Sequence, residues 1–228
     1  MTRIPQKIGS AGAPVPNHAA APLSGRAGRS SWRDYSQDDL PPMLGSALEC
    51  FMEQGYHGTT IRQVAARTGL SVPGLYHHYP SKHALLAALM SHAMSDLWIR
   101  SQQALAEAGT SVSRQFDLLV ECLVLFHALR RELAFIAYSE IRSLDDTART
   151  QHIAARDRQQ RLLDSIIHQG TETGIFNTHY PREATTAVIT MCTGVAQWYQ
   201  PEGPLTPEEL VERYREITAM AVGRSATD

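Results

Sequence analysis

The 228-residue chain is predicted to fold as an all-α protein. Apolar residues recur at positions i, i+3 and i+4 along most of it, which is the spacing of the buried side of a helix. Ser, Thr or Pro precedes several of these segments and Gly ends several of them, as at the caps of natural helices. No stretch argues convincingly for a sheet. We expect a three-helix domain over residues 36–80 and a larger helical domain over residues 81–228.

Residues 1–35 are predicted to form a flexible basic N-terminal arm. They contain several prolines and glycines and little that could form a core. A basic arm could contact phosphates or enter the minor groove of DNA. A solvated extension or a misplaced start codon explains the segment equally well. It carries one acid, Asp34, against the basic residues Arg3, Lys7, Arg26, Arg29 and Arg33.

The first helix is expected to begin near residues 36–39 and to end at Gly55. Acidic residues there suit the positive end of the helix dipole, and Pro41 and Pro42 are tolerated in a first turn. The buried side of this helix and the two helices that follow should share one core. We assign that core to Leu44, Leu48, Phe51, Ile61, Val64, Leu70 and Leu75.

Residues 59–82 are predicted to form two short helices around a tight turn, followed at once by a third helix. The hydroxyl of Thr59 or Thr60 can cap the first helix, and Gly69 can close it in the left-handed conformation. The second helix follows over residues 72–79. So short a connection suits helices that cross steeply, as in a helix-turn-helix whose second helix enters the major groove of DNA.

The charge of this region supports contact with a polyanion. Between Glu53 and Asp96 there is no acidic residue, whereas the window holds Arg62, Arg67, Lys82 and five histidines. The whole chain has a formal charge of −2, so its basicity is local. One nucleic-acid face fits this distribution better than a generally basic protein does. A chance acid-free window is the alternative.

A long helix is expected after Pro80, because Ser81 can cap it and apolar residues continue along it to about Ala108. This helix would be a physical bridge from the three-helix domain to the rest of the chain. Further helices are expected over residues 113–129, 132–142, 146–173, 181–199 and 207–222.

Composition argues against several other classes of protein. Cys50, Cys122 and Cys192 are far apart in apolar helical contexts, so we expect reduced core residues rather than disulfides or metal ligands. The N-terminus lacks an apolar signal segment and no run approaches a membrane span, which predicts a cytoplasmic protein without a membrane partner. No metal or cofactor is expected, since His77 and His78 point about 100° apart on a helix. No enzyme signature is found.

The run LGSALECFMEQGYHGTTIRQVAARTGLSVPGLYHHYPSKHALL, residues 44–86, resembles the N-terminal domain of TetR-type transcriptional regulators. The resemblance implies a homodimeric, all-helical repressor with an effector pocket in its C-terminal domain. Two positions depart from the family pattern: His83 stands where an acid is frequent, and Val72 where a polar residue is frequent.

The C-terminal half looks like the branch of this family that senses acyl-CoA thioesters of lipid or sterol catabolism. The likeness lies in ELAFIAYSEIRSL, residues 132–144, and in WYQPEGPLTPEELVERY, residues 198–214. It implies a small lipophilic effector, an acyl-CoA, for the pocket. Common local structure, a helix followed by a Pro-Gly turn and a capped helix, would give the same pattern.

The resemblance also assigns DNA contacts to nine residues. Phosphate contacts need donors at helix ends and flanks, whereas base readout needs side chains on the first turn of the inserted helix. The implied roles are phosphate or groove-edge contacts for Thr60 and Arg62, base contacts for Ser71, Val72, Gly74 and His77, and phosphate contacts for Tyr76, His78 and Lys82. Packing of Tyr76 against the first helix and an ordinary surface position for Lys82 are the alternatives.

Two further sets of residues are expected in the C-terminal domain. The effector pocket should be lined by apolar side chains, with His127 and Arg142 as polar or anionic anchors: Trp98, Phe116, Leu119, Leu123, Phe126, Phe135, Tyr138 and Trp198. The dimer interface should use small and apolar residues of the last two helices: Ala184, Val188, Met191, Val195, Leu210, Tyr214 and Ile217. Burial within one chain is the alternative for both sets.

Together these features predict a ligand-responsive repressor whose dimer binds a pseudopalindromic operator in double-stranded DNA, with half-sites roughly 10 bp or more apart. Effector binding would shift the long helix, alter the spacing of the two recognition helices and weaken DNA binding. The alternative is a small-molecule-binding or enzymatic helical protein that retains the DNA-binding domain.

Overall fold

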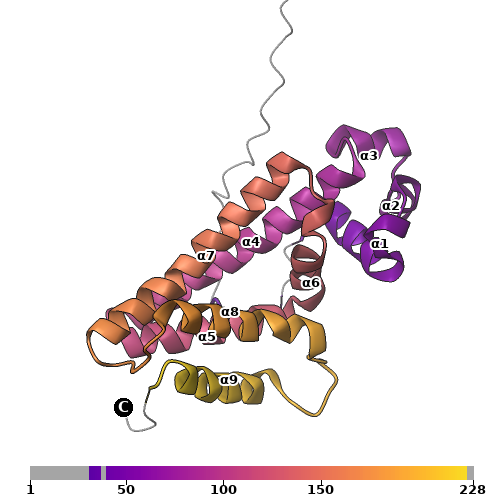
Figure 1. Ribbon diagram of the computed structural model, residues 1–228. Helices are drawn as coiled ribbons and strands as arrows, with labels where there is room; N and C mark the ends of the chain where they lie inside the picture. The colour runs from indigo at the N-terminus through magenta and orange to yellow at the C-terminus, as the bar shows by residue number, and fades with distance from the viewer. Residues whose placement is uncertain (1–30, 37–39, 225–228) are drawn as a thin grey trace, which may run out of the picture. The chain divides into compact units, whose positions relative to one another are not determined.

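The computed structural model describes residues 31–36 and 40–224. In these residues it contains nine α-helices, one short 3-10 helix and no strand (Figure 1), which confirms the predicted all-α class. None of the described helices is long and apolar enough to span a bilayer. The elements are α1 (Pro42–Gly58), α2 (Ile61–Thr68), α3 (Val72–His78), α4 (Lys82–Ala108), α5 (Val112–Leu129), α6 (Arg131–Ser139), η1 (Ile141–Ser143), α7 (Asp146–Glu172), α8 (Pro181–Trp198) and α9 (Pro207–Ala221).

The first three helices pack around a shared core, as expected. Ile61 is partly buried and packs against this core. The prediction that Leu70 lies in this core is wrong. Leu70 follows the α2 cap Gly69 in the turn and is 36% exposed. α1 also continues to Gly58, with a kink at Gly55, whose φ is 73°. The predicted core residues that are buried are Leu44, Leu48, Phe51, Val64 and Leu75.

α4 joins this N-terminal unit to the remaining helices. Ser81 caps it, because its hydroxyl oxygen accepts a hydrogen bond from the Ala84 amide at 3.0 Å. The 27 residues of α4 span roughly 40 Å at about 1.5 Å per residue. Figure 1 shows α4 running from the end of α3 and alongside α7. One continuous helix therefore connects the two parts of the chain.

α5 lies at the centre of the C-terminal helices. It contacts α4, α6, α7, α8 and α9, and every residue from 118 to 128 is buried. A helix that is covered on all sides in this way forms the interior of its domain. Cys122 of α5 and Cys192 of α8 lie in this core and Cys50 lies in the N-terminal one, all three free and buried, which confirms the expected core positions.

Residues 31–36, which we call the strap, correct part of the predicted flexible arm. Trp32 is only 3% exposed, and its indole nitrogen donates a hydrogen bond to Glu107 of α4 at 2.7 Å. Arg33 forms ion pairs with Glu107 and with Glu121 of α5. The strap is thus packed on the C-terminal helices. Residues 1–30 of the expected arm lie outside the described residues.

Arg100 of α4 holds the strap from below. It is 1% exposed, and its guanidinium pairs with Asp96 on the same helix at 3.2 Å. It also donates hydrogen bonds to the backbone carbonyls of Trp32 and Asp34, at 2.7 and 2.9 Å. The Tyr35 ring lies over it, 3.8 Å from the guanidinium carbon. A buried arginine is tolerated here because its charge and its donors are matched in this way.

Candidate DNA-binding surface and ligand cavity

Three caps define the start of α2 and its turn to α3. Thr60 Oγ1 accepts a hydrogen bond from the Gln63 amide at 3.3 Å, and Gln63 Oε1 accepts one from the Thr60 amide at 2.7 Å. Gly69 closes α2 in the left-handed region with a φ of 70°. Ser71 Oγ accepts from the Gly74 amide at 3.2 Å and opens α3. These caps fix the helix-turn-helix connection that the sequence predicts.

α3 presents one side to the N-terminal core and the other to solvent. Leu75 is its buried residue, and Val72 and Gly74 are partly buried. A Cβ added to Gly74 would lie 3.2 Å from Ser71 Oγ, so this glycine also leaves room for the cap. The exposed predicted contacts on α3 are Tyr76, His77 and His78, with Tyr76 45% exposed.

Arg62 and Arg67 on α2 differ in their surroundings. Arg67 pairs with Glu53 at 2.7 Å and with Glu49 at 3.6 Å, both on α1. Its charge is therefore partly neutralised, which the acid-free window between Glu53 and Asp96 does not reveal. Arg62 is exposed near the start of α2, and its phosphate or groove-edge contact, which the family resemblance implies, stays a prediction.

The ammonium group of Lys82 is bound by backbone carbonyl groups of the protein itself. Its ammonium donates hydrogen bonds to the carbonyl oxygens of Tyr56 and Thr59, both at 2.8 Å, and to that of His57 at 3.4 Å. It also lies 4.5 Å from the centre of the Tyr56 ring. These contacts tie the start of α4 to the end of α1. The predicted phosphate contact of Lys82 stays a prediction, and it would have to be made by a group already committed to three acceptors.

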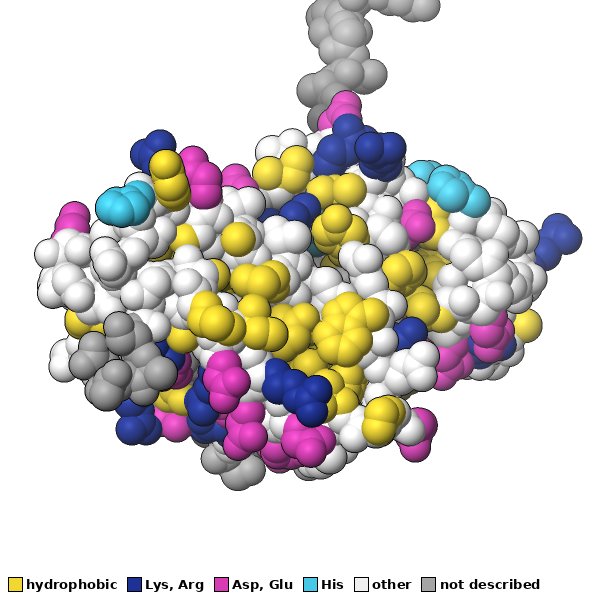
Figure 2. All heavy atoms as spheres, turned by 60° about the horizontal axis from the view of Figure 1, so that its bottom comes forward, with side chains coloured by type: hydrophobic (Ala, Val, Ile, Leu, Met, Phe, Trp, Pro, Cys, Tyr) yellow, Lys and Arg dark blue, Asp and Glu magenta, His cyan; other side chains and the backbone are white. Residues whose placement is uncertain are grey.

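α8 and α9 form an apolar face that is open to solvent. Figure 2 shows apolar side chains gathered on this side of the molecule. Trp198 is 52% exposed and stacks on Tyr214, with ring centres 6.5 Å apart. Ile217 and Met220 are 43% and 70% exposed. We define the α8–α9 face by these four residues and the partly buried Met191.

This face corrects the predicted dimer set. Four of its residues lie in the core of the chain itself, where they cannot reach a partner: Ala184, Val188, Val195 and Leu210. In α8 and α9, both the buried side and the exposed side carry apolar residues. Helical spacing therefore identifies the apolar positions but does not show which of them face solvent. Met191, Tyr214 and Ile217 stay as interface predictions.

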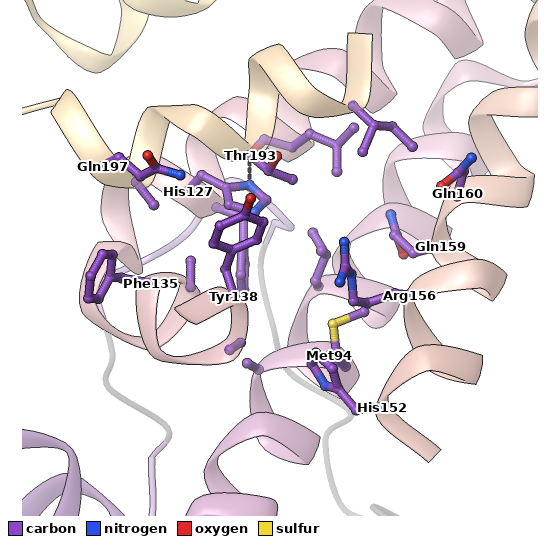
Figure 3. A pocket seen from close by; sticks show the side chains of 18 residues that line it. Met94, His127, Phe135, Tyr138, His152, Arg156, Gln159, Gln160, Thr193 and Gln197 are labelled. Atoms are coloured by element: carbon purple, nitrogen blue, oxygen red, sulfur yellow. Dashed lines mark hydrogen bonds between the residues drawn. The ribbon is translucent and has the colours of Figure 1, made fainter. Parts of the chain in front are cut away.

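A cavity lies among α4, α5, α6, α7 and α8, close to the middle of the C-terminal helices (Figure 3). It holds about 810 Å³ of empty space, counting its open mouth and the solvent there. Its inner wall is apolar and includes Ala93 and Leu97 of α4 and Ala134 and Ala137 of α6. The arrangement suits a ligand with an apolar body.

The predicted pocket set divides into two groups. Five residues line the cavity: Leu123, Phe126, His127, Phe135 and Tyr138. Five do not, and these are corrections. Phe116 and Leu119 are fully buried in the core, with Phe116 packed on Phe176 at 5.1 Å. Trp98 packs beneath Arg158, Arg142 is exposed on η1, and Trp198 lies on the α8–α9 face.

The polar side of the cavity comes mainly from α7, a helix that holds none of the predicted pocket residues. Arg156 supplies the cation expected of Arg142, and Gln159 and Gln160 follow it. Gln159 is 7% exposed and donates a hydrogen bond to Ser101 Oγ at 2.7 Å. Helical spacing from His152 to Arg156 and Gln159 could have indicated one shared side of α7, but nothing in the sequence says that this side meets a cavity.

Two histidines in the cavity wall differ in their environment. His127 Nδ1 lies 2.7 Å from the Leu123 carbonyl oxygen, which places its proton on Nδ1. Burial lowers the pKa of His127 to about 4. Burial and then the nearby charge of Arg156 also lower the pKa of His152, partly offset by the Ala137 backbone. Both rings are therefore neutral at pH 7.

The described residues contain no group of three or more His, Cys, Asp or Glu side chains that could hold a metal ion. The cavity lining offers apolar contact, hydrogen bonds with neutral imidazoles and amides, and the cation of Arg156.

Two family models match the chain. The model described as bacterial regulatory proteins, tetR family, matches residues 44–89, which hold α2, α3 and most of α1. The model described as tetracyclin repressor-like, C-terminal domain, matches residues 109–222, which hold α5 to α9. The first match covers the helix-turn-helix unit, and the second covers most of the helices around the cavity.

Named relatives and solved structures agree with these models. The HTH-type transcriptional repressor KstR2 of Mycolicibacterium smegmatis is 26% identical over 190 residues, or 82% of this chain and 91% of the relative. The TetR family transcriptional regulator PfmR of Thermus thermophilus is 27% identical with a TM-score of 0.74, covering 81% of this chain and 100% of that one. AibR, solved with isovaleryl coenzyme A and operator DNA, shares the fold at 21% identity, with a TM-score of 0.69 over 80% of this chain and 97% of its own.

Proposed function

Because the chain belongs to the TetR family of bacterial regulatory proteins, and is therefore a DNA-binding transcriptional regulator, we propose that it is a repressor released from its operator by an acyl thioester. The proposal has three parts: α3 reads DNA, the cavity among α4 to α8 binds the effector, and α8 and α9 form a homodimer.

The observation that carries the proposal is the path of α4. The helix begins at the Ser81 cap, directly after α3, and Lys82 bonds it to the end of α1. Three turns later Ala93 and Leu97 of the same helix form part of the cavity wall. A ligand that moves this wall must therefore also move the base of the DNA-binding unit. Coupling of this kind needs only a difference in ligand affinity between two positions of α4.

The chemistry of the cavity supports an acyl thioester as the effector class. Its apolar inner wall suits an acyl chain, while His127, His152 and Arg156 supply polar contacts for the thioester end. The relative KstR2 is named as a repressor, and AibR is described in complex with an acyl-CoA and operator DNA. The first description favours a repressor and the second favours an acyl-CoA effector for this chain.

The homodimer is supported by the α8–α9 face. A soluble monomer rarely leaves so many large apolar side chains together in solvent, and Trp198, Ile217 and Met220 are each more than 40% exposed. Two copies joined by this face about a twofold axis would carry two α3 helices. Such a dimer reads a pseudopalindrome with half-sites about one helical turn of DNA apart, or more.

Fluorescence anisotropy with DNA fragments from the region upstream of the gene tests the proposal. We expect nanomolar binding to one fragment, a steep decrease in affinity with salt, and release by octanoyl-CoA at micromolar concentration. Tyr76→Ala should weaken operator binding at least tenfold while it leaves octanoyl-CoA affinity unchanged. Absence of binding to any fragment, or binding that does not vary with salt, would contradict the repressor function.

A further inference from the structure

A second cavity lies between α4 and α7, next to the effector cavity. It holds about 550 Å³ of empty space, counting its open mouth, and we call it the α4–α7 cleft. Its lining is more polar than that of the effector cavity, because Ser91 and Ser95 of α4 and Gln151 and Arg158 of α7 lie there beside alanine, methionine and leucine side chains. These are the donors and acceptors that amides, hydroxyls and phosphates require.

The cleft and the effector cavity have a common wall. Met94 of α4 and His152 of α7 line both of them, and Figure 3 shows these two side chains beside each other at one side of the effector cavity. Methionine is unbranched and adapts its shape readily. Movement of the Met94 side chain would therefore join the two cavities without any change in the backbone.

His152 marks this wall as a ligand contact. It is 6% exposed, and among the described residues neither ring nitrogen makes a well-aligned hydrogen bond, although the Ala137 backbone lies close enough to raise its pKa slightly. A buried polar group without a partner costs roughly 1–3 kcal/mol, so an imidazole kept in this state is poorly explained by packing. A ligand carbonyl can accept the proton of one ring nitrogen, and a neighbouring amide N–H of the ligand can donate to the other.

We propose that the α4–α7 cleft binds the polar carrier arm of the effector, with the thioester carbonyl at His152 and the acyl chain in the effector cavity. This inference rests on the proposed acyl-thioester effector. The ligand class is an elongated amphiphile: an acyl chain, a thioester, and an arm of amides ending in phosphates near Arg158. The guanidinium of Arg158 lies 4.2 Å from the Trp98 ring centre, which holds it at this side of α4.

Two acyl thioesters separate the arm from the acyl end: octanoyl-CoA and octanoyl-N-acetylcysteamine, which keeps the thioester and lacks most of the arm. Ala155 of α7 lines the cleft, whereas its neighbour Ala154 is exposed and lines neither cavity. By titration calorimetry, Ala155→Phe should weaken octanoyl-CoA binding more than tenfold and change octanoyl-N-acetylcysteamine binding less than twofold. Ala154→Phe should match the wild type for both ligands.

The role of His152 is tested with two variants. His152→Leu should weaken both thioesters at least tenfold, because it removes the thioester contact that they share, whereas His152→Gln should restore at least part of the affinity. Operator binding without ligand should be unchanged in Ala154→Phe, since this position lines neither cavity and lies outside α1 to α3.

The outcomes separate this inference from the proposed function. Equal octanoyl-CoA affinity in Ala155→Phe and Ala154→Phe would show that the arm does not occupy the cleft, and would overturn the cleft while the acyl-thioester effector stands. Wild-type protein that binds its operator but neither thioester would overturn the cleft together with the effector class. If the wild-type protein binds octanoyl-CoA but no operator, the repressor function is overturned. The comparison of Ala155→Phe with Ala154→Phe then still decides whether the cleft binds the arm.

Discussion

At the scale of single residues, the neutral state of His127 makes the protein sensitive to acid. Its pKa is about 4 in the folded chain, against about 6.5 for an unperturbed histidine. The unfolded chain therefore binds a proton over this range that the folded chain does not bind. Stability contributed by the neutral ring is fully present above pH 6.5 and is lost as the pH falls toward 4.

We expect this residue to reduce the free energy of unfolding by about 2 kcal/mol between pH 8 and pH 5. His127→Leu should remove that part of the pH dependence, because leucine has no proton to bind. Urea unfolding at pH 8 and pH 5 measures how much unfolding free energy each protein loses on acidification, and the two losses are then compared. A wild type and variant that lose the same stability on acidification would contradict the assignment.

Lys82 gives a second prediction at this scale, because its two possible roles have different consequences. Three backbone carbonyls accept hydrogen bonds from its ammonium, and they lose a charged donor in Lys82→Met. We expect a loss of roughly 1–3 kcal/mol in the free energy of unfolding. Measured by thermal or urea unfolding, this loss distinguishes a structural lysine from a surface one.

The matched variant is Arg62→Met on the exposed side of α2, which should leave stability within about 0.5 kcal/mol of the wild type and reduce operator affinity instead. If Lys82→Met were as stable as the wild type and reduced the salt dependence of operator binding by about one phosphate contact, the lysine would act on DNA and the backbone contacts would be secondary.

Residues whose roles depend on local structure can be predicted from the sequence. Thr60, Gly69 and Ser71 are placed correctly because a cap depends on residues within one turn of it. The sequence points to Arg142 as the anionic anchor of the pocket and misses Arg156, because the identity of the helix side that meets a cavity depends on how distant helices pack. Leu70 fails for a related reason, since a residue after a glycine cap leaves the helical periodicity.

At the scale of elements, the strap is the part of the fold that the sequence hides. Residues 31–36 have no periodicity and follow a stretch rich in proline and glycine, so the sequence predicts a flexible arm there. Their order comes from α4 and α5: Arg100 is buried beneath them, and Glu107 and Glu121 pair with Arg33. These partners are 66 to 88 residues away in the chain. Helices α1 to α9, by contrast, are predicted to within a few residues because most of them carry their own caps and apolar spacing.

The strap should contribute to global stability. Trp32→Ala removes an indole that is 3% exposed and its hydrogen bond to Glu107. We expect a loss of about 3–5 kcal/mol in the free energy of unfolding. Tyr180→Ala removes an aromatic ring that is 69% exposed and should cost less than about 0.5 kcal/mol. Both are measured by urea unfolding. Equal stability of the two variants would mean that the strap is not docked in solution.

At the scale of the whole molecule, the proposed homodimer makes DNA recognition depend on a surface far from α3. One α3 helix offers few side chains to bases: Tyr76, His77 and His78 are exposed, while Val72 and Gly74 add little bonding capacity. In the proposed homodimer, two copies bind the operator together, so that the second contact becomes intramolecular and raises affinity and specificity. The α8–α9 face is the surface available for joining them.

This dependence can be tested with two isoleucines of equal exposure. Ile217 lies on the α8–α9 face and Ile153 on α7, and each is 43% exposed. Ile217→Asp would place a charge against its own copy across the twofold axis, where it cannot be solvated. We expect a monomer by light scattering at micromolar concentration and at least a hundredfold weaker operator binding. Ile153→Asp introduces the same charge at the same exposure and should stay dimeric with operator affinity unchanged. A monomeric wild type, or an Ile217→Asp variant that remains dimeric, would show that α8 and α9 do not hold the two copies together, and the pairing of the α3 helices would then have to come from contacts made on DNA.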